Sequence, residues 1–309
     1  MRTTIKTVLL LLISGFSYAQ QDAQFTQYMY NTISINPAYA GSRETLSIFA
    51  LHRSQWVGLE GAPQTNNISV NTLIKDTNVG IGVSILNDKI GPSDENNIAV
   101  DFSYSVPVSE VFKLSFGLKA SANLLNIDFN KLNQFDGGDS NFAANIDNKF
   151  SPNIGVGFYL HSENTYVGLS MPNLLKTKHY DRYTGTGAAS SLASQDIAYY
   201  LTAGHVFELN DNLKFKPSVL TKLVQGAPLG VDMSANFLIN EKFVAGASYR
   251  LNAAVSGLIG FQATDSWFVG YSYDFDTTGL SNYNSGSHEL FLRFELFNRY
   301  SKIYSPRFF

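Results

Sequence analysis

The chain has 309 residues, a formal net charge of −3 and no cysteine. Charged residues make up 15% of it, compared with about 25% in a typical soluble domain. It contains 23 Phe and 17 Tyr, so it is rich in aromatic side chains. The lack of cysteine excludes disulfides and lipid attachment through a thiol. Because no basic block is present, nucleic acid is not an expected partner.

Residues 1–19 have the pattern of a secretory signal peptide. Arg2 and Lys6 provide a basic start, residues 8–13 are apolar, and Ser17 and Ala19 are the small residues expected before a cleavage site. A transmembrane anchor is the alternative, but it would need about 20 apolar residues. No later stretch reaches that length. We therefore expect export, with cleavage after Ala19.

Residues 20–43 do not alternate between polar and apolar side chains. They contain Phe25, Tyr28, Tyr30 and Tyr39, which a freely solvated periplasmic leader would not need. The interpretation we favour is a plug packed into the mouth of a barrel. The alternative is a docking peptide for a periplasmic partner.

Within residues 44–297, many segments alternate between polar and apolar side chains with a period of two. This pattern predicts β-strands, because successive side chains of a strand point to opposite faces. In residues 288–296, for example, Leu290, Leu292 and Phe294 share one face, whereas Glu289 and Arg293 share the other. About fourteen such segments predict an all-β, antiparallel transmembrane barrel. They are 45–54, 66–74, 78–87, 98–106, 112–119, 153–161, 164–171, 196–208, 213–220, 229–240, 243–251, 255–263, 267–275 and 288–296.

A soluble β-sandwich also alternates, but two further features favour a membrane barrel. Many segments reach the roughly 9–11 residues of a tilted membrane strand. Short turns also alternate with mostly longer connections, as in outer-membrane barrels. The turns are expected at 75–77, 108–110, 162–164, 210–212, 240–242 and 264–266, and the longer connections at 55–65, 88–96, 127–151, 172–195, 225–228, 252–254 and 276–286.

An even number of strands would place both ends of the barrel sequence on the short-turn, periplasmic side. Unpaired backbone groups are costly in lipid, so the strand at 45–54 should pair with the one at 287–297. Pro217 lacks a ladder donor, so we expect a bulge or a strand end near it.

Charged side chains on the polar faces should point into the lumen. Their mixed signs predict a salt-linked, partly plugged interior, and a conducting pore is the alternative. These residues are Asp101, Lys113, Lys119, Lys214, Lys216, Lys222, Asp232, Arg250, Asp274, Glu289, Arg293 and Glu295.

No pattern in the chain indicates catalysis, a cofactor or a metal. His288 and Glu289 are adjacent, so on a strand they face opposite sides. Residues 136–139 lack the spaced ligands of a calcium loop, and His179 has no second histidine nearby. The Gly80–Gly82 and Gly155–Gly157 pairs lie inside strand patterns, where glycine would make room for large side chains. We expect no enzymatic activity.

Several motifs resemble those of the PorP/SprF family, over essentially the whole mature chain. The opening motif is the most specific. The matching residues are Asp22, Phe25, Gln27, Tyr28, Asn31 and 36–41; 53–56 and 61–65; 171–174; and 270–274 and 287–289.

This resemblance implies an outer-membrane component of the type IX secretion system and, in gliding bacteria, of the motility apparatus. It implies support for the export or surface attachment of particular cargo or adhesins through contacts with secretion components. The candidate partner-binding residues are Phe25, Gln27, Tyr28, Asn31, Asn36, Pro37, Tyr39, Gln55 and Trp56. A diffusion porin or small-molecule transporter is the alternative function.

The expected organisation thus has four parts. They are a signal peptide (1–19), an N-terminal periplasmic or plug segment (20–43), an outer-membrane barrel (44–297) and a C-terminal tail (298–309), which is basic and aromatic.

Overall fold

The computed structural model describes residues 23–132, 145–183 and 189–296. The expected signal peptide, the C-terminal tail and residues 136–139 lie outside this range. In the described part, no helix is long and apolar enough to cross a membrane.

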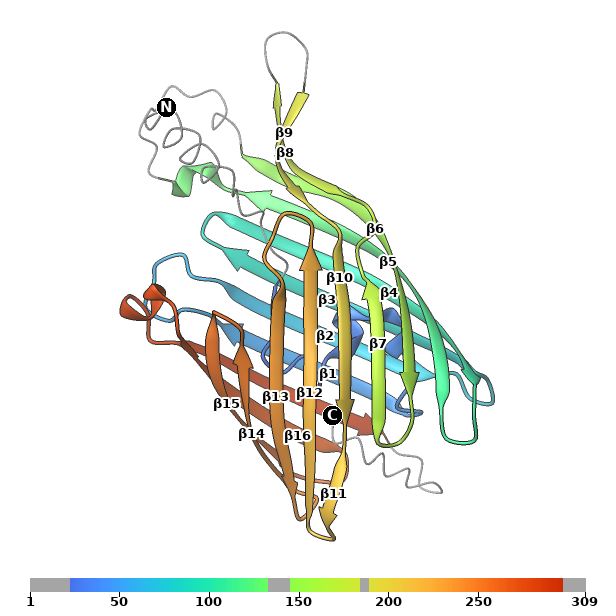
Figure 1. Ribbon diagram of the computed structural model, residues 1–309. Coiled ribbons are helices and arrows are strands. Elements are labelled where there is room, and N and C mark those ends of the chain that lie inside the picture. Colours follow the sequence, from blue (N-terminus) through green and yellow to red (C-terminus); the bar gives the residue numbers. More distant parts are fainter. Residues whose placement is uncertain (1–22, 133–144, 184–188, 297–309) are drawn as a thin grey trace, which may run out of the picture.

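The predicted all-β barrel is confirmed: fourteen antiparallel strands form a closed ring (Figure 1). The ring strands are β1 (Leu46–Ser54), β2 (Gln64–Leu73), β3 (Val79–Ile90), β4 (Ser93–Pro107), β5 (Lys113–Ile127), β6 (Ile146–His161), β7 (Thr165–Met171), β10 (Ala198–His205), β12 (Leu213–Val224), β13 (Gly230–Ile239), β14 (Phe243–Arg250), β15 (Ala254–Gln262), β16 (Trp267–Asp276) and β17 (Ser287–Leu296).

The fold also contains smaller elements that are not ring strands. A hairpin of β8 (Thr177–Tyr183) and β9 (Ala189–Gln195) extends the connection between β7 and β10, and β11 (Phe207–Asn210) continues β10. Within the described residues, the helical elements are single turns: α2 (Thr32–Ile35), η1 (Pro37–Tyr39), η2 (Phe129–Lys131) and η4 (Gly279–Asn282).

The first and last strands close the ring, as predicted. β1 pairs with β17 from Leu46–Leu296 to Ser54–His288. On the opposite side, β10 pairs with both β7 and β12. Closure leaves no open edge in the ring, so the backbone groups of every ring strand have a neighbour on both sides.

The two faces of the barrel have opposite polarity. In β17, Glu289 and Phe291 are buried inside, whereas Leu290 and Leu292 are 48% and 41% exposed on the outside. The same outward band of Val, Ile, Leu and Phe side chains runs around the other strands. A polar interior and an apolar exterior are the reverse of a soluble protein, and they suit lipid surroundings.

The barrel has a turn end and a loop end. All six predicted tight turns join consecutive strands at the turn end, where β1 starts and β17 finishes. The prediction of a longer connection at 88–96 is wrong, because β3 and β4 continue to Ile90 and Ser93. Their alternation is weak there since the polar side chains Asn87, Asp94 and Asn96 bond to one another across the strands.

Pro217 lies within β12, between the cross-strand pairs Gly204–Ser218 and Phe207–Phe215. There the neighbouring strand breaks, at Val206, and β10 gives way to β11. The expected irregularity beside Pro217 is therefore found in the partner strand, and β12 itself remains continuous.

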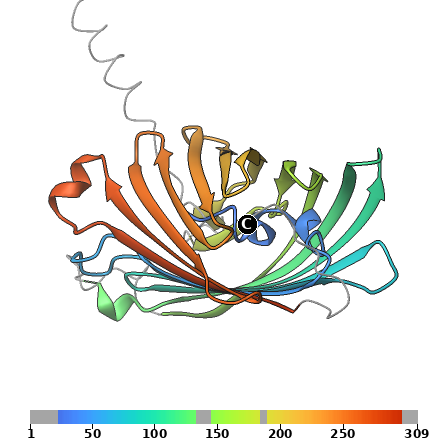
Figure 2. The ribbon, with the colours of Figure 1, turned by 90° about the horizontal axis from the view of Figure 1, so that it is seen from below.

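The described residues before β1, from 23 to 43, lie inside the ring, where Figure 2 shows them in blue. We call residues 23–43 the inner segment. Nearly all of it from Phe25 to Arg43 is buried, and its apolar side chains pack with Phe49, Phe268 and Phe291 of the wall into the main hydrophobic core.

Candidate functional site

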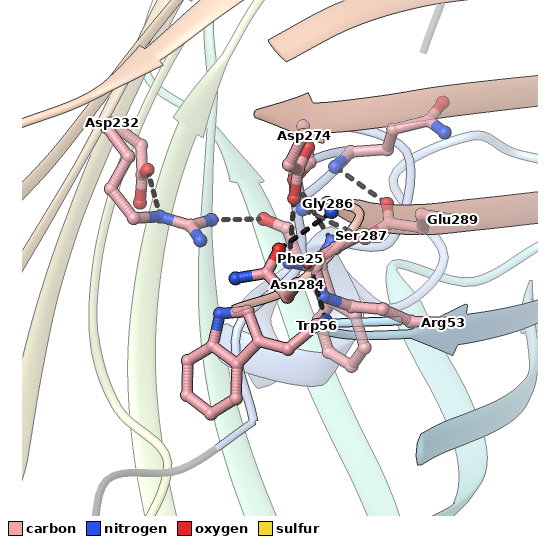
Figure 3. Close-up of polar contacts among 12 residues, drawn as sticks. Phe25, Arg53, Trp56, Asp232, Asp274, Asn284, Gly286, Ser287 and Glu289 are labelled. Carbon is pink, nitrogen blue, oxygen red and sulfur yellow. Dashed lines mark hydrogen bonds and ion pairs between the residues drawn. The ribbon is translucent and has the colours of Figure 1, made fainter. Parts of the chain in front are cut away.

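The inner segment is held near the loop end by a group of charged side chains that we call the clasp. The clasp consists of Arg53, Asp274 and Glu289 (Figure 3). Arg53 is near the end of β1, and its guanidinium lies 2.7 Å from Asp274 and 3.1 Å from Glu289. All three side chains are almost fully buried. Buried charges are tolerated only when they are paired and hydrogen-bonded.

The clasp binds the backbone of the inner segment. Glu289 accepts hydrogen bonds from the backbone N–H groups of Thr26 and Gln27, at 3.0 and 2.9 Å. The Thr26 hydroxyl donates to the Asp274 carboxylate at 2.7 Å. Because charge-assisted bonds are stronger than neutral ones, this short stretch is fixed by its backbone as well as by its side chains.

A second ion pair lies beside the clasp. Arg250, the last residue of β14, binds Asp232 at 2.6 Å and contacts the Phe25 carbonyl at 3.5 Å (Figure 3). Side chains from several barrel strands therefore contact the inner segment at the loop end.

Aromatic side chains hold the middle of the inner segment. The Tyr30 ring lies 4.7 Å from the Phe291 ring and 5.4 Å from the Phe268 ring. The Arg293 guanidinium and the Lys216 ammonium lie 5.8 and 5.7 Å from the Tyr30 ring centre. Cations in this position are attracted by the ring face, so Tyr30 helps to accommodate buried positive charge.

The single turn of α2 is capped by a lysine from the wall. Lys119 donates to the carbonyls of Ile33 and Ser34, each at 3.3 Å, and lies 3.4 Å from Asp101. Because the last carbonyls of a helical turn lack internal partners, Lys119 satisfies groups that would otherwise be unpaired in the lumen.

The motif at residues 36–41 packs against glycines of the barrel strands. A Cβ atom at Gly117 would lie 2.1 Å from the Ala38 nitrogen, and one at Gly80 would lie 2.1 Å from the Ala40 oxygen. Glycine is therefore required for close backbone contact. The strand glycines expected to make room for side chains differ in what they face. Gly82 and Gly157 face the side chains of Ile33 and Asn36, as expected, whereas Gly80 faces the main chain of Ala40 and Gly155 that of Pro172.

Side-chain bonds fix the same motif in place. Asn36 donates to the Phe158 carbonyl at 3.0 Å and accepts from the Ala38 nitrogen at 3.0 Å, and Ser103 donates to the Ala40 carbonyl at 2.6 Å. Pro37 begins η1, where its fixed φ suits the first helical position.

At the turn end, Arg43 and Glu295 form a buried ion pair, with Nη2 and Oε2 3.0 Å apart. The inner segment is therefore held by ion-paired side chains near both ends of the barrel.

The structure separates the predicted partner-binding residues into two groups. Phe25, Gln27, Tyr28, Asn31, Asn36, Pro37 and Tyr39 are buried in the lumen. Gln55 and Trp56 are half-buried in the loop between β1 and β2. Gln55 lines an open pocket of about 390 Å³ together with parts of that loop and Lys89.

The loop that carries Trp56 is tied to the loop between β16 and β17. The backbone N–H of Trp56 donates a hydrogen bond to the Ser287 hydroxyl at 3.2 Å. The backbone N–H of Val57 donates to the Gly286 carbonyl, and the Val57 carbonyl accepts from the backbone N–H of Ser285. Trp56 has a positive φ of 50°, which is strained for a non-glycine residue and persists only where surrounding contacts enforce it.

Most of the predicted inward charges are buried in the lumen. The exceptions are Lys113, which is exposed at the turn end and pairs with Glu44, and three residues that are only partly buried: Lys214, Asp232 and Arg250. In the sequence, Arg53 stands out only as part of the motif at residues 53–56 and not as the centre of the clasp. Its inward position follows from alternation with Phe49 and Leu51 in β1, so this signal was present.

His288 and Glu289, the adjacent pair considered as a possible acid and base, do not act on a common site. His288 and Glu289 lie on opposite faces as predicted, and the His288 ring bonds to the Tyr271 hydroxyl at 2.7 Å while Glu289 belongs to the clasp. Among the described residues, no group of His, Cys, Asp and Glu could hold a metal ion.

The sequence of this barrel matches a known protein family. The family described as "Type IX secretion system membrane protein PorP/SprF" matches residues 17–294. The chain belongs to the PorP/SprF family. This PorP/SprF protein is therefore an outer-membrane barrel of the type IX secretion system.

The solved structure of a hydrocarbon channel shares the fold of this PorP/SprF barrel at low sequence identity, and two further outer-membrane structures are more distantly similar. The CymD monoaromatic hydrocarbon channel is 14% identical with a TM-score of 0.52, covering 92% of this chain and 96% of its own. Omp33 of Acinetobacter baumannii is 10% identical with a TM-score of 0.48, covering 82% and 99%. The toluene transporter TodX of Pseudomonas putida is 9% identical with a TM-score of 0.48, covering 91% and 94%. Among curated protein sequences, no significant match was found.

Proposed function

We propose that this PorP/SprF barrel supports the export or surface attachment of specific secreted proteins by binding protein partners. The observation that carries the proposal is the occupied lumen: the inner segment is buried along its length and anchored by the clasp and by Arg43–Glu295. A barrel filled in this way is suited to a scaffold for proteins rather than to a conduit for small solutes.

The partners are type IX secretion components and the cargo or adhesin they deliver, including motility adhesins in a gliding bacterium. Gln55 and Trp56 are the candidate contacts that a partner can reach directly, because they are only half-buried in a loop. The buried candidates, from Phe25 to Tyr39, would touch a partner only after the inner segment left the lumen.

Deletion of residues 22–41 tests this proposal. We expect the shortened barrel to remain in the outer membrane, because its strand ladder is intact, and to lose cargo display and partner recovery. Surface display is measured with antibodies on intact cells, and partners are recovered by cross-linked pull-down. Heat-modifiable migration in gels shows whether the shortened barrel is folded. Normal cargo display by a folded deletion variant would contradict the proposal.

The alternative function is that of a diffusion porin or small-molecule transporter, which the shared fold with a hydrocarbon channel makes worth testing. We expect the purified full chain to show little or no stable conductance in planar bilayers, because the inner segment fills the lumen. The deletion variant should conduct strongly. A large, stable conductance from the full chain would favour the porin and count against the scaffold.

A further inference from the structure

The inner segment crosses the barrel in one direction, which its contacts reveal residue by residue. Thr26 and Gln27 are bound by Asp274 and Glu289, which lie near the loop ends of β16 and β17. Phe25 is contacted by Arg250, the last residue of β14 before a loop. The N-terminal end of the inner segment is therefore at the loop end.

Later residues lie progressively closer to the turn end. The carbonyls of Ile33 and Ser34 are bound by Lys119, in the middle of β5. Ala40 contacts Gly80, the second residue of β3, and Arg43 pairs with Glu295, the penultimate residue of β17. The chain then turns back at Glu44 and enters β1, which runs toward the loop end again.

The fold thus carries the inner segment through a closed ring. Glu289 and Glu295 are six residues apart on β17, a rise of about 20 Å along a strand. The stretch from Thr26 to Arg43 covers that span in a compact path with the turns α2 and η1. It could not lie outside the wall, since its polar contacts are made with inward side chains.

The two ends of an outer-membrane barrel face different compartments. Short turns face the periplasm and longer loops face the outside. In this chain the six tight turns share the end at which β1 starts and β17 finishes, whereas the β8–β9 hairpin and the η4 loop lie at the other end (Figure 1).

We propose that the N-terminal end of the inner segment, at Ala23, faces the cell surface. The chain then runs inward through its own barrel, reaches the periplasmic end near Glu44, and only there begins β1. The sequence prediction of a periplasmic or plug segment is refined: the inner segment spans the lumen and offers its first residues outward, next to the clasp and the loop that carries Trp56.

This arrangement adds an interaction surface that faces outward. A protein outside the cell can reach Ala23 and Gln24, which are half-buried, without crossing the membrane. The contact of Arg250 with Phe25 and the clasp contacts of Thr26 and Gln27 follow directly along the chain, so a partner that binds the exposed end acts on the anchor of the inner segment.

Single cysteines test this polarity cleanly, because the chain has none of its own. Ala23→Cys is compared with two references in the full chain. Tyr283→Cys, at a position 72% exposed, marks the loop end, and Lys75→Cys, in the exposed turn after β2, marks the turn end. A maleimide that cannot cross the outer membrane is added to intact cells and to permeabilised cells.

We expect Ala23→Cys and Tyr283→Cys to be labelled on intact cells, and Lys75→Cys only after permeabilisation. A short epitope inserted directly before Ala23 gives a second readout, since packing around Ala23 can slow its labelling. Antibody binding to the epitope on intact cells supports the proposal. Labelling and antibody binding only after permeabilisation, in step with Lys75→Cys, would overturn it.

Discussion

Replacing Arg53 with alanine is expected to destabilise the folded barrel by about 3–5 kcal/mol, because it leaves two buried carboxylates without their cation. Asp274 and Glu289 lie 2.7 and 3.1 Å from the Arg53 guanidinium, and both also bind the inner segment. Their mutual repulsion would loosen Thr26 and Gln27 as well. Stability is measured by denaturant unfolding in lipid vesicles and by heat-dependent migration in gels.

Two matched variants sharpen this experiment. Lys113→Ala removes one partner of the ion pair with Glu44, whose side chains are 50% and 35% exposed, so its cost should stay below about 1 kcal/mol. Arg53→Lys retains the charge but cannot bridge both carboxylates with a planar fork, so its cost should be intermediate. If Arg53→Ala proved no more harmful than Lys113→Ala, the clasp would not be a stabilising anchor.

Replacing Gly117 with valine is expected to expel residues 36–41 from the wall. The atoms closest to a new Cβ are the Ala38 nitrogen at 2.1 Å, the Ala38 Cα at 2.5 Å and the Pro37 carbonyl carbon at 2.5 Å. All three are backbone atoms, which cannot rotate out of the way as a flexible side chain can. We expect the free energy of unfolding to fall by about 1–3 kcal/mol, which is typical of overpacking.

The displaced segment should be detectable in two ways. Protease added to the folded protein in detergent should cleave within residues 36–41, and conductance in planar bilayers should rise. Gly257→Val is the control, because a Cβ at that position in β15 meets no atom within 4 Å. A Gly117→Val barrel that resists protease and remains closed, like the control, would show that the wall tolerates the added side chain without moving the segment.

The barrel could be predicted from the sequence because its signal is local. Each strand carries its own alternation, so Leu290, Leu292 and Phe294 reveal an outward face whatever the rest of the chain does. Pairing of the first strand with the last also followed, since open edges are costly in lipid. The boundaries at Ile90 and Ser93 were missed because polar side chains there replace the apolar alternation.

The path of the inner segment could not be predicted in the same way. Phe25, Tyr30 and Tyr39 indicate burial, but residues without a period give no direction along the lumen. The polarity depends on contacts between residues far apart in the chain, such as Thr26 with Asp274 and Arg43 with Glu295. In the sequence, Gly80 and Gly117 look like ordinary glycines within strands. Their role becomes clear only from the backbone of the inner segment that packs against them in the structure.

The β-barrel, the closure of its ring and the opposite polarity of its two faces follow from the amino-acid pattern alone, because side-chain alternation and the pairing of backbone groups act strand by strand. Three features become visible in the folded barrel: which charges pair, the position of Arg53 at the centre of the clasp, and the location of the N-terminal end of the inner segment at the loop end. Those features arise where side chains from β1, β16 and β17 converge in the lumen, and pairing across such sequence distances leaves no periodic signal.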